Sequence, residues 1–366
     1  MNRYASLQAR VLSVEAAGLK RELRELEMLD GVRGILCGRP VTVFCSNDYL
    51  GLAHHPDVRA AFDGTGVGAS RLISGNRPAH VALEEKLSEL YGRPATLFSS
   101  GYHANLALMS TVVGRGDAVA SDALNHASLI DGLRLSRATR QVLAHGDFSG
   151  IKPGTRMVVV EGVYSMDGDI LALDSYRGEH WLAVDEAHAF GVLGPEGRGA
   201  AASQGIEPDF VVGTLGKAIG TYGAFVVGPP SLRELLVSRG RTFIFTTGLP
   251  EPVVRASMVA LSLATDARRD RLAENVSRFR EGLRGLSIDA LGQTHIVPIV
   301  LGSRTMAVAD ALLARGLWVA GIRAPTVPEG TERLRITLSA SHTSEQIDRL
   351  LDGIDAALKE NPDDHA

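Results

Sequence analysis

The stretch that decides the fold is residues 210–217, Phe-Val-Val-Gly-Thr-Leu-Gly-Lys, in which a short apolar run leads into glycines and a lysine. Residues 182–188, Leu-Ala-Val-Asp-Glu-Ala-His, have the same arrangement, with acidic groups and a histidine after the apolar run. Short, nearly continuous apolar runs that alternate with helical intervals are typical of buried strands in a parallel sheet. We therefore expect an α/β fold with a mostly parallel central sheet and helices on both faces.

The same pattern extends over residues 95–228. Ligands of open α/β sheets bind at the carboxyl ends of the strands, so the polar residues that follow the apolar runs should gather at one edge of the sheet. We expect the active site at that edge. The other apolar runs are Ala95–Phe98, Ala118–Ala120, Met157–Val160 and Ala224–Val227.

The regions on either side of this sheet have a different pattern. Leucines and alanines recur at steps of three and four over residues 7–29, which predicts one amphipathic helix, and Val41–Cys45 predicts a short strand. After Pro250 the sequence predicts a smaller α+β unit. Its expected segments are helices near 252–285, 305–315 and 344–359, and strands at Ile296–Leu301, Leu317–Ala320 and Leu334–Leu338.

The length of the chain is enough for more than one domain. With 366 residues and roughly 150 residues per domain as a prior, we expect two domains with a large core. The predicted division is an N-terminal helix and arm over 1–44, a large domain over 45–252 and a small C-terminal domain over 253–366.

Composition excludes several classes of protein. Lys plus Arg number 38 and Asp plus Glu 42, so the net charge of −4 lacks the basic excess of a general nucleic-acid binder. The two cysteines, Cys37 and Cys45, exclude a disulfide scaffold and a four-cysteine zinc site, and we expect no metal. The sequence contains no run of about 18 apolar residues, so it predicts no transmembrane helix. We expect a cytoplasmic protein with no nucleic-acid or membrane partner.

One motif is misleading. Gly64-Thr-Gly-Val-Gly-Ala69 fits the glycine pattern of dinucleotide sites, but that pattern counts only between a strand and a helix. The preceding residues, 56–63, predict a helix instead of a strand. We therefore do not expect a nicotinamide cofactor.

Lys217 is the residue whose position points most directly to chemistry. A lone lysine is usually a solvated surface charge, a strand-end aspartate is often a helix cap, and a lone histidine is often a core residue. Lys217 instead lies directly beyond an apolar strand and among glycines, where a solvated surface is not expected. A lysine held in a cleft can lose its proton and act as a nucleophile toward carbonyls.

The strand-end motifs together resemble a known family. An Asp-x-x-His at one strand end, followed about thirty residues later by Thr-x-Gly-Lys, resembles the fold-type I enzymes that use pyridoxal 5'-phosphate (PLP). Further strings narrow the resemblance to the α-oxoamine synthases over about residues 15–355. They are Ser46-Asn-Asp-Tyr-Leu-Gly-Leu52, Asn125-His-Ala-Ser128, Glu161-Gly-Val-Tyr-Ser-Met-Asp-Gly168, Val184-Asp-Glu-Ala-His188, Gly197-Arg-Gly199 and Thr214-Leu-Gly-Lys217.

The resemblance implies a set of cofactor residues. Lys217 would hold PLP as a Schiff base and later move a proton, Asp185 would pair with the ring nitrogen, and His188 would bind the phenolic oxygen. His126 would stack on the ring and touch the substrate. The remaining implied cofactor contacts are Gly101 and Tyr102 through their backbone at the phosphate, Thr214, Ser165, and Thr246 and Thr247 from a neighbouring subunit.

The resemblance also implies substrates and an assembly. Arg323 would clamp the carboxylate of the amino acid, and Arg21, Asn47, His126 and Thr326 would be further substrate contacts. Because Thr246 and Thr247 would reach across an interface, the protein is expected to be a homodimer with shared active sites. Three helical intervals, near 57–68, 148–156 and 170–180, look short for the family and should reduce the helical layer more than the chemistry.

The C-terminal string Ile322-Arg-Ala-Pro-Thr-Val-Pro-Glu-Gly-Thr-Glu-Arg-Leu-Arg-Ile-Thr-Leu338 is most similar to the biotin-pathway member of the family. The implied reaction is a decarboxylating condensation of L-alanine with pimeloyl-CoA or pimeloyl-carrier protein, giving 8-amino-7-oxononanoate, CO2 and free thiol. The alternatives are 2-amino-3-ketobutyrate CoA ligase, 5-aminolevulinate synthase and serine palmitoyltransferase, which share the cofactor residues. A scaffold protein that has lost its chemistry is a further alternative, but Lys217, Asp185, His188 and His126 are all present.

Overall fold

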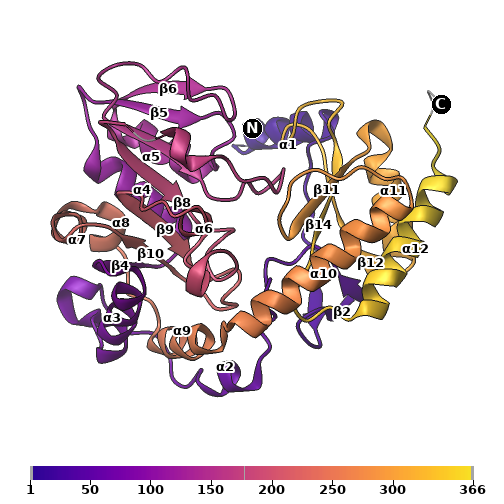
Figure 1. Ribbon diagram of the computed structural model, residues 1–366, viewed down its shortest axis with the longest axis horizontal. Helices are drawn as coiled ribbons and strands as arrows, with labels where there is room; N and C mark the ends of the chain where they lie inside the picture. The colour runs from indigo at the N-terminus through magenta and orange to yellow at the C-terminus, as the bar shows by residue number, and fades with distance from the viewer. Residues whose placement is uncertain (1–2, 177, 364–366) are drawn as a thin grey trace.

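The computed structural model describes residues 3–176 and 178–363. Its main feature is a seven-stranded sheet with the strand order β4–β10–β9–β8–β7–β5–β6 (Figure 1). All six predicted apolar runs are strands of this sheet. The strands are β4 (Ala95–Phe98), β5 (Ala118–Asp122), β6 (Thr139–Leu143), β7 (Met157–Glu161), β8 (Trp181–Asp185), β9 (Phe210–Thr214) and β10 (Ala224–Val227).

The sheet is mostly parallel, as the sequence predicts. The neighbouring pairs β5–β6, β5–β7, β7–β8 and β8–β9 are parallel. Strand β10 is antiparallel to both β9 and β4. Parallel strands bring their carboxyl ends to the same edge, so Glu161, Asp185 and Thr214 end their strands on one side of the sheet.

Helices cover both faces of the sheet, which explains the continuous apolar runs. Successive side chains of a strand point to opposite faces. On β10, Phe225 packs in the cluster that contains Leu83 of α3 (Pro78–Tyr91), whereas Val226 packs in the cluster that contains Leu108 of α4 (Gly101–Val112). With both faces buried, most positions of these strands are apolar, and the polar residues Glu161, Asp185 and Thr214 stand at the strand ends.

Strand β6 is the one strand of the sheet that the sequence pattern does not predict. Its sequence is Thr-Arg-Gln-Val-Leu, and only Leu143 is buried. The strand lies at the edge of the sheet, beside β5 alone, and it keeps most of its side chains in contact with solvent. An exposed edge strand needs no apolar run, and the pattern that identifies its neighbours is therefore missing.

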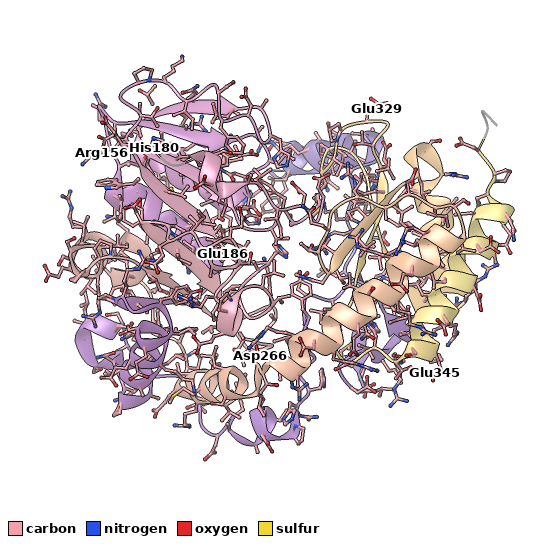
Figure 2. All side chains as sticks on the ribbon, viewed as in Figure 1. Arg156, His180, Glu186, Asp266, Glu329 and Glu345 are labelled. Atoms are coloured by element: carbon pink, nitrogen blue, oxygen red, sulfur yellow. The ribbon has the colours of Figure 1, made fainter. Side chains whose placement is uncertain are left out.

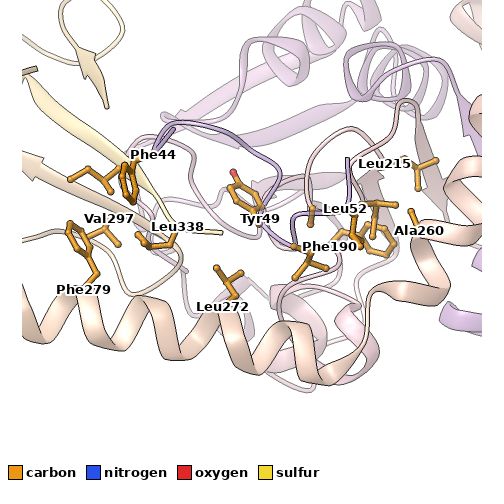
Figure 3. Packing of buried hydrophobic residues seen from close by; sticks show 14 of the residues in the cluster. Phe44, Tyr49, Leu52, Phe190, Leu215, Ala260, Leu272, Phe279, Val297 and Leu338 are labelled. Carbon is orange, nitrogen blue, oxygen red and sulfur yellow. The ribbon is translucent and has the colours of Figure 1, made fainter. Parts of the chain in front are cut away.

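The C-terminal unit contains a three-stranded antiparallel sheet. Its order is β11 (Ile296–Val300), β14 (Arg333–Thr337) and β13 (Ala320–Ile322). One hydrophobic cluster runs from Phe190 and Leu215 beside the large sheet to Phe279 and Val297 in this unit (Figure 3). The helices of the unit are α10 (Asp266–Gly285), α11 (Thr305–Ala314) and α12 (Ser344–Glu360), and α10 and α12 pack together (Figure 1).

Two predicted segments of the C-terminal region are divided. The helical region expected over 252–285 is two helices, α9 (Glu251–Leu263) and α10, because Ala264 has a non-helical backbone and Thr265 is the N-cap of α10. The strand expected at Leu317–Ala320 is split between two sheets. Its first part is β12 (Leu317–Trp318), which pairs with the N-terminal arm, and Ala320 begins β13.

The predicted N-terminal helix over 7–29 is wrong in its second half. Helix α1 (Ala5–Ala16) ends before Gly18, which has a φ of 65° and adopts the left-handed conformation that ends many helices. The chain then forms β1 (Leu26–Met28), β2 (Arg33–Leu36) and β3 (Arg39–Val43). These strands make a four-stranded sheet with β12, so the arm is hydrogen-bonded to the C-terminal third of the chain. The domain boundaries at 44 and 252 stay predictions.

The three short intervals contain little helix. The first holds all but the first residue of α2 (Pro56–Ala60), and the second has no helix. In the third, the described residues, which leave out 177, contain one 3-10 turn at Leu173–Tyr176. Within the described ranges, no helix is both long enough and apolar enough to span a membrane.

Candidate active site

Lys217 lies three residues beyond β9, at the edge where the parallel strands end. Its Nζ atom is 2.8 Å from Nε2 of His188. Burial lowers the pKa of Lys217 to about 8, and the charge of Arg335 adds to this effect, whereas the carboxylates of Asp185 and Glu161 oppose it. A lysine with this pKa exists partly as the free amine near neutral pH, which is the form that attacks a carbonyl.

A close backbone contact shapes the loop after Lys217. Gly220 has a φ of 70°, and a Cβ atom there would lie 2.4 Å from the backbone nitrogen of Ala53. Only glycine allows this approach. The loop that carries Lys217 is thereby packed against the segment that follows the Ser46–Leu52 string.

Asp185 is a buried carboxylate at the end of β8, with 6% of its surface exposed. It accepts hydrogen bonds from Asn105 Nδ2 at 2.7 Å and from the backbone N–H of Ala187 at 3.0 Å. The other amide atom of Asn105, Oδ1, is buried without a partner. A buried carboxylate beside an unsatisfied acceptor fits a ligand group that carries a proton and a positive charge, such as a protonated ring nitrogen.

His188 is buried three residues after Asp185 and is bonded on both ring nitrogens. Nε2 faces Lys217, and Nδ1 lies 2.7 Å from the hydroxyl of Tyr49. Burial, with the positive charges of Lys217 and Arg335, holds the pKa of His188 well below its usual range. The ring is therefore a neutral imidazole.

His126 and Glu161 meet between β5 and β7. The backbone N–H of His126 donates to the Glu161 carboxylate at 2.5 Å, and the ring Nδ1 of His126 is 2.7 Å from the hydroxyl of Ser128. Burial lowers the pKa of His126. Burial and the neighbouring charge of Asp185 raise the pKa of Glu161 well above its usual range. Glu161 begins one of the family strings, although the resemblance gives this residue no role.

The start of α4 offers an anion site. The helix begins at Gly101, and the hydroxyl of its N-cap, Ser100, accepts from the N–H of His103 at 3.2 Å. The first N–H groups of a helix have no partner within it, and the positive end of the helix dipole attracts phosphate. Thr214 is the last residue of β9, at the edge where the parallel strands end. Its hydroxyl donates to the Gly223 carbonyl at 3.1 Å.

Glu186, labelled in Figure 2, directly follows β8 and packs against the Gly197–Gly199 string. Its buried carboxylate accepts from the backbone N–H groups of Ala200 and Ala201, each at 2.8 Å. A Cβ at Gly199 would lie 2.4 Å from Cδ of Glu186, so this string needs its glycine. Burial raises the pKa of Glu186 to about 7.

Three predicted substrate residues line one cavity. Arg21, Arg323 and Thr326 line a space of about 400 Å³, and Nη1 of Arg323 donates to the carbonyl of Gly18. Arg323 is exposed. The structure therefore brings these three predicted residues together around one cavity.

Arg335 is a functional candidate that the motifs do not identify. It is buried on β14, where its Nε donates to the carbonyl of Ser165, and its charge opposes the rise that burial causes in the pKa of Tyr49. Neither group is negatively charged, whereas the neighbouring Arg333 pairs with Asp167 at 2.5 Å. A buried guanidinium with neutral partners, close to Lys217, is suited to bind a carboxylate ligand. The alternation of residues in the strand places both arginines on one face, which is the signal that the sequence offers.

Asn47 also lies near this centre, since its Oδ1 accepts from the Tyr49 hydroxyl at 3.0 Å. Thr246 and Thr247 are not brought to Lys217. They line a small cavity with Ser99, two residues before α4, and Thr247 is exposed. Tyr102 is also exposed, with its hydroxyl bonded to Asp131.

The comparisons with known proteins agree with this geometry. The aminotransferase class I and II family matches residues 39–354. A protein from Methylococcus capsulatus named 8-amino-7-oxononanoate synthase is 47% identical, covering 94% of this chain and 96% of its own. A protein from Desulforudis audaxviator named putative 8-amino-7-oxononanoate synthase is 45% identical, covering 97% of this chain and 99% of its own.

A solved structure matches the fold over the same range. The serine palmitoyltransferase of S. paucimobilis with a bound PLP–myriocin aldimine superposes with a TM-score of 0.89 and 31% sequence identity, covering 98% of both chains. The chain therefore belongs to the aminotransferase class I and II family, in the α-oxoamine synthase branch that its strand-end motifs resemble.

Proposed function

We propose that this chain is a PLP-dependent acyltransferase that condenses L-alanine with a pimeloyl thioester and releases CO2, the free thiol and 8-amino-7-oxononanoate. The observation that carries the proposal is Lys217, a half-buried amine with a pKa of about 8 whose Nζ lies 2.8 Å from a neutral imidazole. The curated relatives at 45% and 47% identity are named for this reaction. The cofactor is PLP, which the solved serine palmitoyltransferase holds as an aldimine with myriocin.

Each group at the edge of the sheet has a task in this reaction. When bound, PLP supplies an electron sink that stabilises negative charge on the amino-acid α-carbon. Asp185 favours the protonated ring nitrogen on which that property depends. The residues that we propose hold PLP are Lys217, Asp185, His188, His126, Ser165, Thr214, the backbone of Gly101 and Tyr102, and the partner-side Thr246 and Thr247.

Lys217 moves the proton in this reaction. Its Nζ atom has a pKa close to neutrality, so it can release a proton and take one up without a large cost in either direction. His188 Nε2, 2.8 Å away, orients the amine. The charges of Asp185 and Lys217 both act on the pKa of His126, and we assign its ring to contact with cofactor and substrate.

The two arginine sites suit the two carboxylates of the substrates. We assign the carboxylate of alanine to Arg335, because this guanidinium is buried close to Lys217 and has neutral partners. Arg323, which the motif assigned to alanine, shares its cavity with Arg21 and Thr326. We assign that cavity to the acyl substrate, whose pimeloyl chain ends in a free carboxylate when it is carried by CoA.

The shared-site dimer is part of the proposal. Thr246 and Thr247 follow Phe245, which is 71% exposed. The segment 71–75 packs against the helix just before them, and Ile73 in this segment is 82% exposed. Large exposed apolar side chains beside a candidate phosphate contact favour an interface between two copies of this chain. Each copy would then supply its two threonines to the site of the other.

The reaction is tested by thiol release with crossed substrates. Alanine with pimeloyl-CoA should exceed glycine with acetyl-CoA or succinyl-CoA, and serine with palmitoyl-CoA, by roughly tenfold or more, which is about 1.4 kcal/mol in the barrier. Mass spectrometry should identify 8-amino-7-oxononanoate. If serine with palmitoyl-CoA is fastest instead, the chain is a serine palmitoyltransferase and the proposed substrates are wrong.

Substitutions of the two arginines should raise the KM values of different substrates. Arg335→Ala should raise the KM for alanine by about 30-fold or more, because losing one partner of a buried charged pair costs about 2 kcal/mol or more. Arg335→Lys should restore little, because a point charge does not replace a planar two-pronged donor. Arg323→Ala should raise the KM for pimeloyl-CoA and leave that for alanine within a few-fold. The reverse pattern would return alanine to Arg323.

The shared site is tested by mixing two inactive chains. A Lys217→Ala chain and a Thr246→Ala/Thr247→Ala chain should each form inactive homodimers. Their heterodimer should regain activity, because one of its two sites contains a native lysine from one chain and native threonines from the other. Absence of activity in a verified heterodimer would mean that each site is built from a single chain.

A further inference from the structure

His145 is a histidine that the proposed reaction does not use, two residues beyond the edge strand β6 (Figure 1). Its side chain is 28% exposed, and both of its ring nitrogens face carboxylates. Nδ1 lies 3.0 and 3.1 Å from the two oxygens of Asp122, and Nε2 lies 2.9 Å from an oxygen of Asp169. Asp122 ends β5, and Asp169 directly follows the Glu161–Gly168 string. The ring therefore bridges two separate segments.

Counting protons gives the charge of this bridge. An ionised carboxylate can only accept a hydrogen bond, and an imidazole nitrogen donates only when it carries a proton. Each of the two contacts therefore needs one proton between nitrogen and oxygen, whichever atom holds it. The bonds to Asp122 and Asp169 raise the pKa of His145 to about 10. Burial would raise the pKa of Asp122, but the bonds that this carboxylate accepts outweigh burial and lower it. Both protons therefore lie on the imidazole, which is positively charged.

One end of the bridge holds the turn that leads to His126. The carboxylate of Asp122, a buried residue, also accepts from the backbone N–H groups of Leu124 at 2.8 Å and Gly146 at 3.1 Å. Leu124 is two residues before His126, which is the N-cap of α5 (Ala127–Ser136). We call residues 122–126 the His126 turn. Its start is fixed by a carboxylate that is itself bonded to His145.

The other end of the bridge holds the turn that contains Ser165. The backbone N–H of Tyr164 donates to the Asp169 carbonyl at 3.2 Å, and that of Gly168 donates to the Tyr164 carbonyl at 2.8 Å. We call residues 164–169 the Ser165 turn. The ring of His145 packs edge to face on the ring of Tyr164, with 4.5 Å between centroids. His145 therefore contacts this turn at its first and last residues.

We propose that His145 is a positioning residue of this active site, a charged bridge that holds the His126 turn and the Ser165 turn together. The registered pairing of β5 with β7 ends at Ser121 and Val159, so side-chain bonds are needed to hold the segments beyond it. The inference rests on the proposed cofactor contacts of His126 and Ser165. It adds the group that joins the two segments from which those contacts come.

The charge of the bridge is tested by NMR on the full chain labelled with 15N-histidine, in which His145→Gln identifies the signals by their loss. At about pH 8 an unperturbed imidazole, with a pKa near 6.5, is neutral. Both ring nitrogens of His145 should still carry protons at that pH. Asp169→Asn removes one of the two negative charges, so His145 should lose its second proton at a lower pH than in the wild type.

The positioning role is tested by the affinity for PLP and by the visible circular dichroism of the bound cofactor. His145→Gln leaves the buried Asp122 without a positive partner, so the Kd for PLP should rise by about tenfold. With saturating PLP, the dichroic band should be weaker, because the turns no longer hold the ring in one orientation. Asp169→Asn, which has nearly the same shape as the native residue, should change both quantities in the same direction by a smaller factor.

The matched control is His180→Gln. His180 directly precedes β8, at the opposite end of that strand from Asp185, and its Nε2 lies 2.6 Å from the carbonyl of Tyr176 (Figure 2). This substitution removes a histidine from the same sheet without touching either turn. It should leave the His145 signals, the Kd for PLP and the dichroic band unchanged.

The possible results separate the bridge from the proposed reaction. A neutral His145 in the wild type at about pH 8 would overturn the proposal. So would a His145→Gln chain that is less stable but keeps the PLP affinity and the dichroic band of the wild type, because the bridge would then only support the fold. A charged His145, with weaker PLP binding in both variants, would support it. Neither measurement depends on turnover, so the result stands even if the thiol-release assay identifies another substrate pair.

Discussion

The removal of Lys217 from water is the interaction on which the rest of the site depends. Burial favours the free amine, and the carboxylates of Asp185 and Glu161 keep the charged form accessible, so that the two states lie close in free energy. This balance needs polar groups from several strands at one place. A parallel sheet supplies them, because β7, β8 and β9 end at the same edge.

Sequence patterns predict those parts of the fold that are buried on both faces. The runs at Ala95–Phe98 and Ala224–Val227 match β4 and β10 residue for residue, because every residue of both strands is buried and nearly all are apolar. Strand β6 and most of the arm strands are not predicted, because they are short or exposed. The pairing of the arm also depends on partners that are distant in sequence. The strand pairing of β3 with β12, for example, joins residues 42 and 317.

The same distinction holds for the site. Lys217, Asp185 and His188 lie in strings whose spacing can be read along the chain, and the fold brings all three together. Arg335, Asn105 and Tyr49 gain their significance only from contacts made across the fold, such as the bond of Asn105 to Asp185, eighty residues away. Arg323 shows a limit of reading strings along the chain. It belongs to a distinctive string, and its neighbours in space are Arg21 and the Gly18 carbonyl. Its predicted contact with alanine stays a prediction.

The chemistry of the whole site depends on Lys217 as the residue that binds the cofactor covalently. The most direct measurement of this role is borohydride reduction of the PLP-loaded protein, followed by digestion and mass spectrometry of the peptides. We predict a phosphopyridoxyl group on the peptide that contains Lys217, and no such group in a folded Lys217→Ala chain treated in the same way. A reduced cofactor attached to a different lysine, or one that persists in Lys217→Ala, would contradict this assignment.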